Sequence, residues 1–313
     1  MPLPNATEEP GACTSSRLPG FHCPICDAEL PSAVSPWAFY CEACDYWGSV
    51  LEPVTGVLAK DDFLTHAERQ NVLNPIHYLD DLRIANFRRI VRLISDHKPT
   101  ASGAVLEVGC GPGLFLTEAT GAGINAVGIE PFEAMARRGR ANGCTVRIGL
   151  FPDCVDLHEQ FDAIVFNDVF EHLPNASDVL GTCLQHLVPG GLVVLNLPNA
   201  HGLFFRIARL VAALGHQGPW DRMWQKMFWS PHLHYWSPRS LESLCARVGL
   251  ERATEPIAMA SVSCRGLWKR IRAAPNSSLA GSLVSYAGSL CCTAISPFFT
   301  SDCYVQLFRK PSY

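Results

Sequence analysis

The sequence has few charged residues and no excess of basic ones. Only 17% of its 313 residues are charged, against about 25% in typical soluble proteins, and its 25 Lys and Arg are matched by 29 Asp and Glu. Because broad nucleic-acid binding usually goes with a basic domain, no nucleic-acid partner is expected. The hydrophobic share of 48% is high enough to bury a core, which argues against a disordered chain.

The N-terminus also lacks the features of a secretory signal. Residues 1–10 contain neither a basic segment nor an apolar run, so a cytoplasmic location is expected. In that reducing compartment, clustered cysteines serve metal binding or catalysis more often than disulfide formation. Residues 1–20 are rich in Pro, Gly, Ser and Thr without periodicity, which predicts a disordered tail.

Four of the 14 cysteines form two closely spaced pairs. Cys23 and Cys26 are separated by 14 residues from Cys41 and Cys44. Two C-x2-C pairs supply four thiolates, which suit tetrahedral zinc and leave no coordination position open, whereas a redox role would need only one pair. We predict a zinc ribbon over residues 21–50, in which structural zinc stabilises a module too small for its own core.

Short apolar runs alternate with helical patterns beyond this ribbon. The predicted strands are 104–108, 124–129, 144–149, 162–167, 191–197 and 304–309, and the predicted helices are 76–97, 113–121, 132–142, 176–187 and 238–248. This alternation predicts a doubly wound α/β domain over residues 76–313. Residues 199–236 and 258–301 do not follow it, and we interpret them as insertions that contact a substrate.

A glycine-rich turn joins the first of these strands to the helix at 113–121. Gly109, Gly111 and Gly113 let the backbone turn sharply and approach a ligand, and the helix N-terminus behind them favours an anionic group. Glu130 ends the next strand and can accept hydrogen bonds from both hydroxyls of a ribose. A plain turn and a dinucleotide site are the alternatives, but the latter expects G-x-G-x-x-G, and Leu114 stands where its third glycine should fall.

Several motifs, in order, resemble those of class I S-adenosylmethionine-dependent methyltransferases of the small-molecule, quinone and glycan branch. They are VLEVGCGPGLFL at 105–116, VGIEP at 127–131, FDAIVFNDVFEHLPN at 161–175, HLVPGGLVVLNLPN at 186–199 and HLHYWSPRSLESLCARVGL at 232–250. The resemblance implies a Rossmann-like, seven-stranded methyltransferase sheet preceded by the zinc ribbon. It also implies S-adenosylmethionine as the cofactor.

The resemblance places the cofactor residue by residue. It implies that Glu107, Gly109, Gly111 and Gly113 line the methionine end, that Glu130 holds the ribose, and that Asn167 lies near the amino-acid end. The family often has an Asp after the third strand, near the adenine. Here Asp153 comes two residues late, so the backbone N–H of Leu150 is expected to serve instead.

Titratable side chains follow the fourth strand. Asp168, Glu171 and His172 have the spacing of one helical face, which would open toward the cofactor at the carboxyl end of the sheet. Quinone-precursor O-methyltransferases carry a similar Glu-His pair. We expect His172 or Glu171 to act as the base that removes the acceptor's proton, or the group to hold a divalent ion; a simple cap of the turn is the alternative.

Two further histidines flank Leu233. In an extended segment His232 and His234 would lie on one side, facing the acceptor, and His234 is a further catalytic candidate beside a purely structural role. Residues 201–214 are apolar, with Arg206 and Arg209 near one face, and residues 279–296 are uncharged but polar. Buried helices, an interfacial helix and a membrane span are the three interpretations.

The expected function is therefore methyl transfer, most simply to oxygen, on a small-molecule, glycan or lipid-linked acceptor. An interfacial helix would favour a lipid-linked glycan or a prenylated ring and a peripheral contact with a membrane. A binding or scaffold protein that keeps the fold without chemistry, and an NAD-dependent enzyme, are the alternatives.

Overall fold

The computed structural model describes residues 21–53, 77–98, 103–226, 228, 230–261 and 299–312. The predicted tail at 1–20 lies outside these residues, as do residues 262–298 of the second predicted insertion. Among the described residues, none of the helices is long and apolar enough to span a bilayer.

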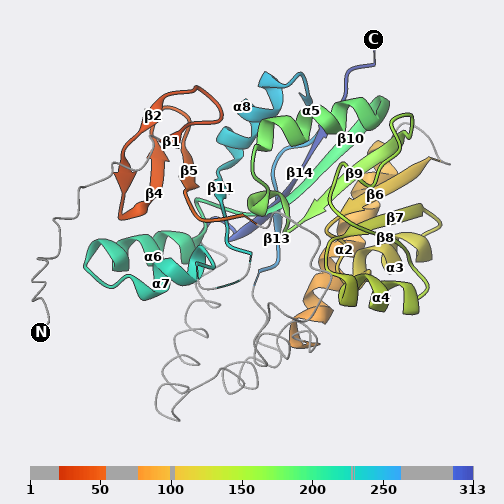
Figure 1. The fold of residues 1–313 in the computed structure, drawn as a ribbon, viewed down its shortest axis with the longest axis horizontal. Coiled ribbons are helices and arrows are strands. Elements are labelled where there is room, and N and C mark those ends of the chain that lie inside the picture. Colours follow the sequence, from red (N-terminus) through yellow and green to blue (C-terminus); the bar gives the residue numbers. More distant parts are fainter. Residues whose placement is uncertain are drawn as a thin grey trace, which may run out of the picture.

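A central sheet of eight strands organises the molecule (Figure 1). Its strands are β6 (Ala104–Val108), β7 (Asn125–Glu130), β8 (Thr145–Ile148), β9 (Phe161–Asn167), β10 (Leu187–Pro198), β12 (Glu251–Arg252), β13 (Ile257–Met259) and β14 (Cys303–Arg309). The order is β12-β14-β10-β9-β6-β7-β8, with β13 also beside β14. The predicted Rossmann-like sheet is confirmed, and the eighth strand arises because two short strands, β12 and β13, both pair with β14.

The strand order locates the place where a ligand can bind. Strands β6 to β10 run parallel, and β6 pairs with β7 on one side and with β9 on the other. The connections therefore leave β6 and β9 in opposite directions, and their carboxyl ends flank a crevice of the kind that binds ligands in doubly wound sheets. The glycine turn follows β6, and the Asp168–His172 segment follows β9.

Helices cover both faces of the sheet. α2 (His77–His97), α3 (Leu114–Gly121) and α4 (Glu133–Ala141) pack with Val105 on one face, whereas α5 (Ala176–His186) and α8 (Pro238–Arg247) pack with Leu106 on the other. Because these parallel strands are buried on both faces, they appear in the sequence as continuous apolar runs, and the predicted limits match the observed ones closely.

A second sheet links the N-terminal module to the predicted insertion. The module contains β1 (Phe21–His22), β2 (Glu29–Leu30), β3 (Ser32–Ala33), β4 (Ser35–Cys41) and β5 (Tyr46–Ser49). The insertion contributes α6 (Leu203–Ala213), α7 (Gly218–Met223) and β11 (His234–Trp236), and β11 pairs antiparallel with β5. The second sheet therefore has the order β11-β5-β4-β3 and combines three strands of the N-terminal module with one strand of the predicted insertion.

Aromatic packing reinforces this junction. The Trp47 ring of β5 lies 5.4 Å from that of Trp220 and 5.7 Å from that of Phe205, both with edge-to-face geometry. Such pairs each contribute about 0.5–1.5 kcal/mol beyond the burial of their area. Residues 199–236 therefore form a helical lobe that rests on the N-terminal module beside the main sheet (Figure 1).

Candidate functional site

A cavity of about 860 Å³ opens at the carboxyl ends of β6, β7 and β9. It is at the upper end of the size range of ligand sites, which is about 300–1,000 Å³. Its wall includes Val108, Gly109, Ile129, Glu130, Leu150 and Phe151 at one end, and Phe204, Ile207, Ala208, Pro219 and Met223 of the α6–α7 lobe at the other. The catalytic candidates Asp168, Glu171 and His172 also line it.

The glycine turn has the backbone that the sequence suggested. Gly109, Gly111 and Gly113 have φ angles of 70°, 52° and 80°, a region that favours glycine. A Cβ at Gly109 would lie only 2.6 Å from a methyl group of Val169, whereas one at Gly111 would meet nothing within 4 Å. Gly109 therefore allows the turn to pack against the segment after β9, and Gly111 leaves open space beside the loop.

Glu130 is joined directly to this turn. Its Oε2 accepts a hydrogen bond from the Gly111 N–H and its Oε1 accepts one from the Phe132 N–H, each at 2.8 Å. Burial raises the pKa of Glu130, and these two N–H groups oppose the shift. The carboxylate lines the cavity and retains lone pairs for further donors such as ribose hydroxyls.

Two more of the predicted cofactor residues form a buried pair behind the cavity wall. Asn167 donates through Nδ2 to Oε1 of Glu107 at 2.8 Å. Oε2 of Glu107 is buried and has no hydrogen-bond partner among the described residues, and burial raises the pKa of this carboxyl well above its usual range. Neither side chain is among those that line the cavity, although both were expected to contact the cofactor.

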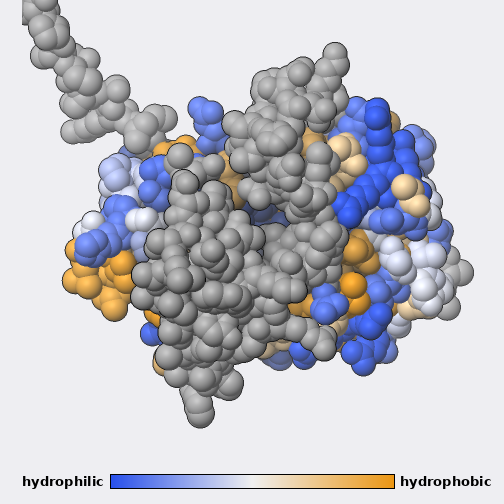
Figure 2. Space-filling model, turned by 90° about the horizontal axis from the view of Figure 1, so that it is seen from below, coloured by the Kyte–Doolittle hydropathy of each residue, from blue (hydrophilic) through white to orange (hydrophobic). Residues whose placement is uncertain are grey.

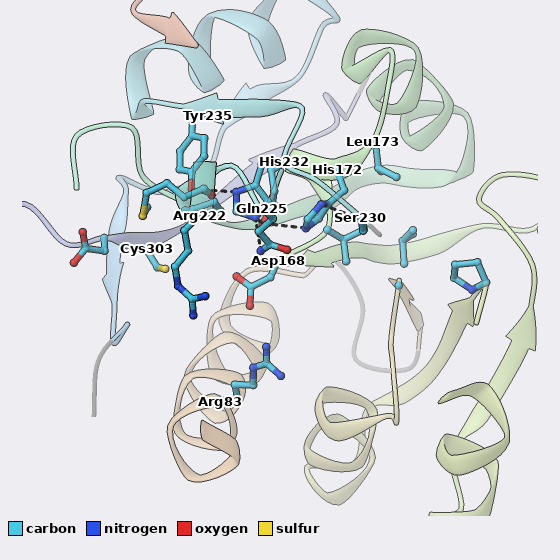
Figure 3. A pocket seen from close by; sticks show the side chains of 18 of the residues that line it. Arg83, Asp168, His172, Leu173, Arg222, Gln225, Ser230, His232, Tyr235 and Cys303 are labelled. Atoms are coloured by element: carbon cyan, nitrogen blue, oxygen red, sulfur yellow. Dashed lines mark hydrogen bonds and ion pairs between the residues drawn. The ribbon is translucent and has the colours of Figure 1, made fainter. Parts of the chain in front are cut away.

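The catalytic candidates lie in a tight turn after β9. Asp168 has a left-handed φ of 54°, and the 3-10 turn η2 (Phe170–His172) follows it, so the expected helical face is only one short turn. Such backbone strain is common in binding and catalytic loops. Asp168, Glu171 and His172 nevertheless all line the cavity, as the sequence spacing indicated. Figure 3 shows Asp168 and His172 there.

A hydrogen bond determines which nitrogen of the His172 ring carries the hydrogen. Its Nδ1 lies 2.9 Å from the Pro231 carbonyl oxygen, which can only accept, so Nδ1 carries the hydrogen and Nε2 has a free lone pair. Burial lowers the pKa of His172, which keeps the ring neutral at physiological pH. A neutral imidazole with a free nitrogen is suited to accept a proton.

Glu171 lies beside that free nitrogen. Its Oε1 is 3.9 Å from Nε2 of His172 and 4.0 Å from Nε2 of His232, while its buried Oε2 has no hydrogen-bond partner among the described residues. Burial, with a further contribution from the charge of Asp168, raises the pKa of Glu171 well above its usual range. The three side chains thus form a compact group with one unsatisfied carboxyl oxygen.

The structure separates the two histidines that were expected to face the acceptor together. His232 lines the cavity, whereas His234 is buried in β11, where its Nδ1 lies 2.5 Å from the Tyr46 hydroxyl. The difference arises at Leu233, whose N–H donates to the Glu171 carbonyl, so the regular strand begins only at His234. Burial lowers the pKa of His234 to about 4.

Other residues that line the cavity belong to no sequence motif, so the sequence analysis did not identify them. Gln225 lies 2.8 Å from Nε2 of His232, and Nδ1 of that ring lies 3.0 Å from the Tyr235 hydroxyl, which donates to the Met223 carbonyl (Figure 3). Nδ1 of His232 must then donate, and its Nε2 accepts from the Gln225 amide. Arg83 and Arg222 also reach the cavity, from α2 and α7.

The four clustered cysteines come together as predicted. Their sulfur atoms all lie within 4.8 Å of one another, and those of Cys26 and Cys41 are 3.7 Å apart. A tetrahedral zinc site with bonds of about 2.3 Å has sulfur–sulfur edges of about 3.8 Å. The arrangement therefore fits a four-thiolate metal centre.

Comparison with known sequences identifies a protein family and similar enzymes. Residues 78–255 match a family described as "Methyltransferase domain". The mitochondrial ubiquinone biosynthesis O-methyltransferase of Homo sapiens is 28% identical over 206 residues, which cover 60% of this chain and 53% of that protein. The enzyme of the same name from Bradyrhizobium sp. is 25% identical over 173 residues, covering 51% of this chain and 68% of that protein. The chain thus spans about half the length of its human relative.

Solved structures with similar folds were also found. A cyclopropane synthase from Mycobacterium tuberculosis has a TM-score of 0.49 and 15% identity, covering 71% of this chain and 83% of that chain. Magnesium protoporphyrin IX methyltransferase from Synechocystis, with bound SAH, has a TM-score of 0.49 and 11% identity, covering 80% of this chain and 90% of that chain.

Proposed function

Because this chain belongs to the methyltransferase-domain family, we propose that it transfers a methyl group from S-adenosylmethionine to an oxygen of a small or lipid-linked acceptor. The observation that carries the proposal is that one cavity is lined both by residues predicted to bind the cofactor and by residues predicted to act on the acceptor. Glu130 and Gly109 of the glycine turn line it, and so do Glu171 and His172.

The cofactor end offers partners for the ribose and the adenine of S-adenosylmethionine. Glu130 would accept hydrogen bonds from the ribose, and Leu150 would border the adenine. When bound, the cofactor supplies an electrophilic methyl group on a sulfonium. The cavity wall positions the acceptor oxygen against it and excludes water, and proximity of this kind accounts for much of the rate of a displacement reaction.

The acceptor's proton needs a destination as its oxygen becomes a nucleophile. We assign that role to Nε2 of His172, since the Pro231 carbonyl holds the opposite nitrogen as a donor and burial keeps the ring neutral. Glu171 would orient the hydroxyl through its unpartnered oxygen. A positioned base contributes typically about 10²–10⁴-fold to the rate.

A divalent ion held by the same group is the second arrangement for this chemistry. Glu171, His172 and His232 offer ligand atoms within 4.8 Å of one another. In the described arrangement, however, Nε2 of His232 accepts from the Gln225 amide, so an ion would have to displace that bond. This contact favours His172 as a base.

The acceptor is best described as an apolar molecule with a hydroxyl on a ring. The part of the cavity wall built by α6 and α7 is mostly apolar, with Arg222 as its charged side chain. The relatives are named for ubiquinone biosynthesis, and together these observations support a prenylated aromatic acceptor. Incorporation of labelled methyl into a lysate, separated into lipid, glycan, protein and RNA fractions, is the direct test. Label is expected in the lipid fraction, and label confined to protein or RNA would contradict the proposal.

Calorimetry separates this function from its alternatives. The purified protein is expected to bind S-adenosylmethionine and not NADH. Preferential binding of NADH would indicate an NAD-dependent enzyme. Binding of S-adenosylmethionine without turnover on any fraction would favour a scaffold protein that keeps the pocket.

We further propose that the cysteine cluster holds one structural zinc ion per chain. Elemental analysis of purified protein is expected to give about one zinc, and Cys41→Ser is expected to lose it because three thiolates no longer close the tetrahedron. Cys144→Ser, which changes a half-buried cysteine outside the cluster, should leave the zinc content unchanged. Intact protein that contains no zinc would refute this assignment.

The outer face of α6 supports a peripheral contact between a cytoplasmic enzyme and a membrane surface. Ile207, Leu210 and Leu214 are exposed on it, although their sequence neighbours Phe205, Ala208 and Ala212 are buried. Figure 2 shows hydrophobic surface at the end of the molecule where α6 and α7 lie in Figure 1. Ile207 also lines the cavity, so an acceptor anchored in a bilayer could enter along this face.

Liposome flotation tests that contact. The protein is expected to float with phosphatidylcholine vesicles that contain phosphatidylglycerol, and Leu210→Glu is expected to reduce the bound fraction at least about fivefold, since inserting one leucine side chain contributes about 1.5–3 kcal/mol. Leu157→Glu makes the same change at another exposed leucine, outside the α6–α7 lobe, and should have no effect. Wild-type protein that stays with the unbound fraction would contradict the membrane contact.

A further inference from the structure

The cysteine module is built into the wall of the catalytic group. Cys41 ends β4, Cys44 lies in the turn that follows, and β5 then pairs along its length with β11 of the catalytic domain. In this register Gly48 pairs with His234, and Tyr46 pairs with Trp236. The strands that carry half of the metal ligands therefore share one sheet with the segment that leads out of the cavity.

One line of hydrogen bonds runs from β5 to Glu171 through a single layer of residues. The Ser49 hydroxyl donates to the His232 carbonyl at 3.1 Å, and the Ser49 N–H donates to the Leu233 carbonyl at 2.9 Å. The Leu233 N–H in turn donates to the Glu171 carbonyl at 2.8 Å. Ser49 thus holds the backbone of His232 and Leu233 in place. Leu233 in turn holds the backbone of Glu171.

A second line begins at Tyr46, two residues after Cys44. Nε2 of His234 lies 3.0 Å from the Leu173 carbonyl oxygen, which can only accept, so Nε2 carries the hydrogen and Nδ1 accepts from the Tyr46 hydroxyl. Tyr46 and His234 are both buried. This line ends at Leu173, so the two lines hold the backbone at Glu171 and at Leu173, on either side of His172.

We propose that metal binding by the four cysteines positions Glu171, His172 and His232 for methyl transfer, so that the enzyme is active only while its N-terminal module is loaded. The inference rests on the proposed function and extends the role of the zinc beyond stabilising the module. The physical reason is that a module this small depends on its metal for order, and both lines of hydrogen bonds start from the hairpin that the metal closes. Tyr46 and Ser49 are positioning residues in this scheme.

Hydrogen exchange measures the proposed coupling without any need for turnover. Zinc is removed from the full-length protein with a chelator and then restored with zinc chloride. Amides in residues 168–173 and 230–236 are expected to exchange at least about tenfold faster without zinc and to recover when it returns, while β6 and β7 keep their protection. If residues 21–49 lose protection and these two segments do not, the inference is overturned.

Single substitutions test each line in protein that keeps its metal. Ser49→Ala and Tyr46→Phe each remove one side-chain hydrogen bond and are expected to speed exchange in the same segments about fivefold, with zinc content and S-adenosylmethionine affinity unchanged. Tyr40→Phe is the matched control, because its hydroxyl bonds Asp45 within the module, and it should alter neither segment. Equal effects of all three variants would indicate general destabilisation and overturn the positioning roles.

Methyl-transfer assays of the same variants then measure how the loss of these hydrogen bonds affects catalysis. With a short-chain prenylated catechol as the acceptor, Ser49→Ala and Tyr46→Phe are expected to lower kcat about fivefold or more and leave the KM for S-adenosylmethionine within twofold. If no variant, including the wild type, methylates this probe, the proposed acceptor is wrong. The exchange result still decides whether the metal holds the turn.

Discussion

Replacement of Glu130 with alanine is expected to lower the affinity for S-adenosylmethionine by at least about a hundredfold. The carboxylate accepts hydrogen bonds from the N–H groups of Gly111 and Phe132. Its loss therefore removes the hydrogen-bond acceptor for the ribose hydroxyls and also one contact that holds the glycine turn. Hydrogen bonds to a charged group contribute about 1.5–3 kcal/mol each, and about 1.4 kcal/mol corresponds to a factor of ten in affinity. Two such contacts to the ribose therefore account for the expected loss, which calorimetry would measure.

Two further variants make this result specific. Glu130→Gln keeps the shape and one acceptor oxygen and should have an intermediate affinity. Glu133→Ala removes an acid three residues away whose partner is Arg137 on the outside of α4, and binding should stay within twofold of the wild type. Should Glu130→Ala bind as tightly as Glu133→Ala, this carboxylate does not hold the cofactor, and the enzymatic interpretation of the cavity loses its basis.

Removal of the proposed base should slow catalysis and leave cofactor binding intact. His172→Ala and Glu171→Gln are each expected to cut turnover at least about tenfold, the lower end of what a positioned base or orienting group contributes. Affinity for S-adenosylmethionine should stay within twofold, because neither side chain lies at the Glu130 end of the cavity. His158→Ala changes an exposed histidine and serves as the control.

The pH dependence of kcat/KM identifies which side chain takes the proton. Burial lowers the pKa of His172, so its neutral, reactive form persists to a lower pH than that of an ordinary histidine, which titrates near 6.5. The rate should therefore stay constant at neutral pH and fall only as the pH drops below about 6.5. That limb should disappear in His172→Ala. Unchanged turnover in both His172→Ala and Glu171→Gln would remove the base from the proposal.

The sequence alone located the main sheet and the glycine turn for a physical reason. Strands buried on both faces need continuous apolar side chains, and a loop with positive φ angles needs glycine at fixed positions, so both leave a local pattern. The predicted strand 104–108 coincides with β6, and Glu130 ends β7 beside Gly111 as expected. Local rules sufficed because each of these features is determined by residues close together in the chain.

Features that depend on distant residues left no such pattern. The strand β11 has only three residues and is defined by pairing with β5, whose Tyr46 is 188 residues away from His234. Gln225 and Arg222 reach the cavity from the α6–α7 lobe, where nothing in the spacing distinguishes them from surface residues. The difference between His232 and His234 likewise depends on one backbone bond from Leu233 to Glu171.

The pairing of β5 with β11 also affects how the protein folds during its synthesis. The N-terminal module leaves the ribosome long before His234–Trp236 has been translated, so the outer edge of β5 has no neighbour for most of synthesis. Unpaired strand edges attract other chains, and contacts between distant residues form slowly. The catalytic wall is therefore completed only once β11 has been made, far beyond β5 in the chain, and until then the open edge of β5 is a place where aggregation can start.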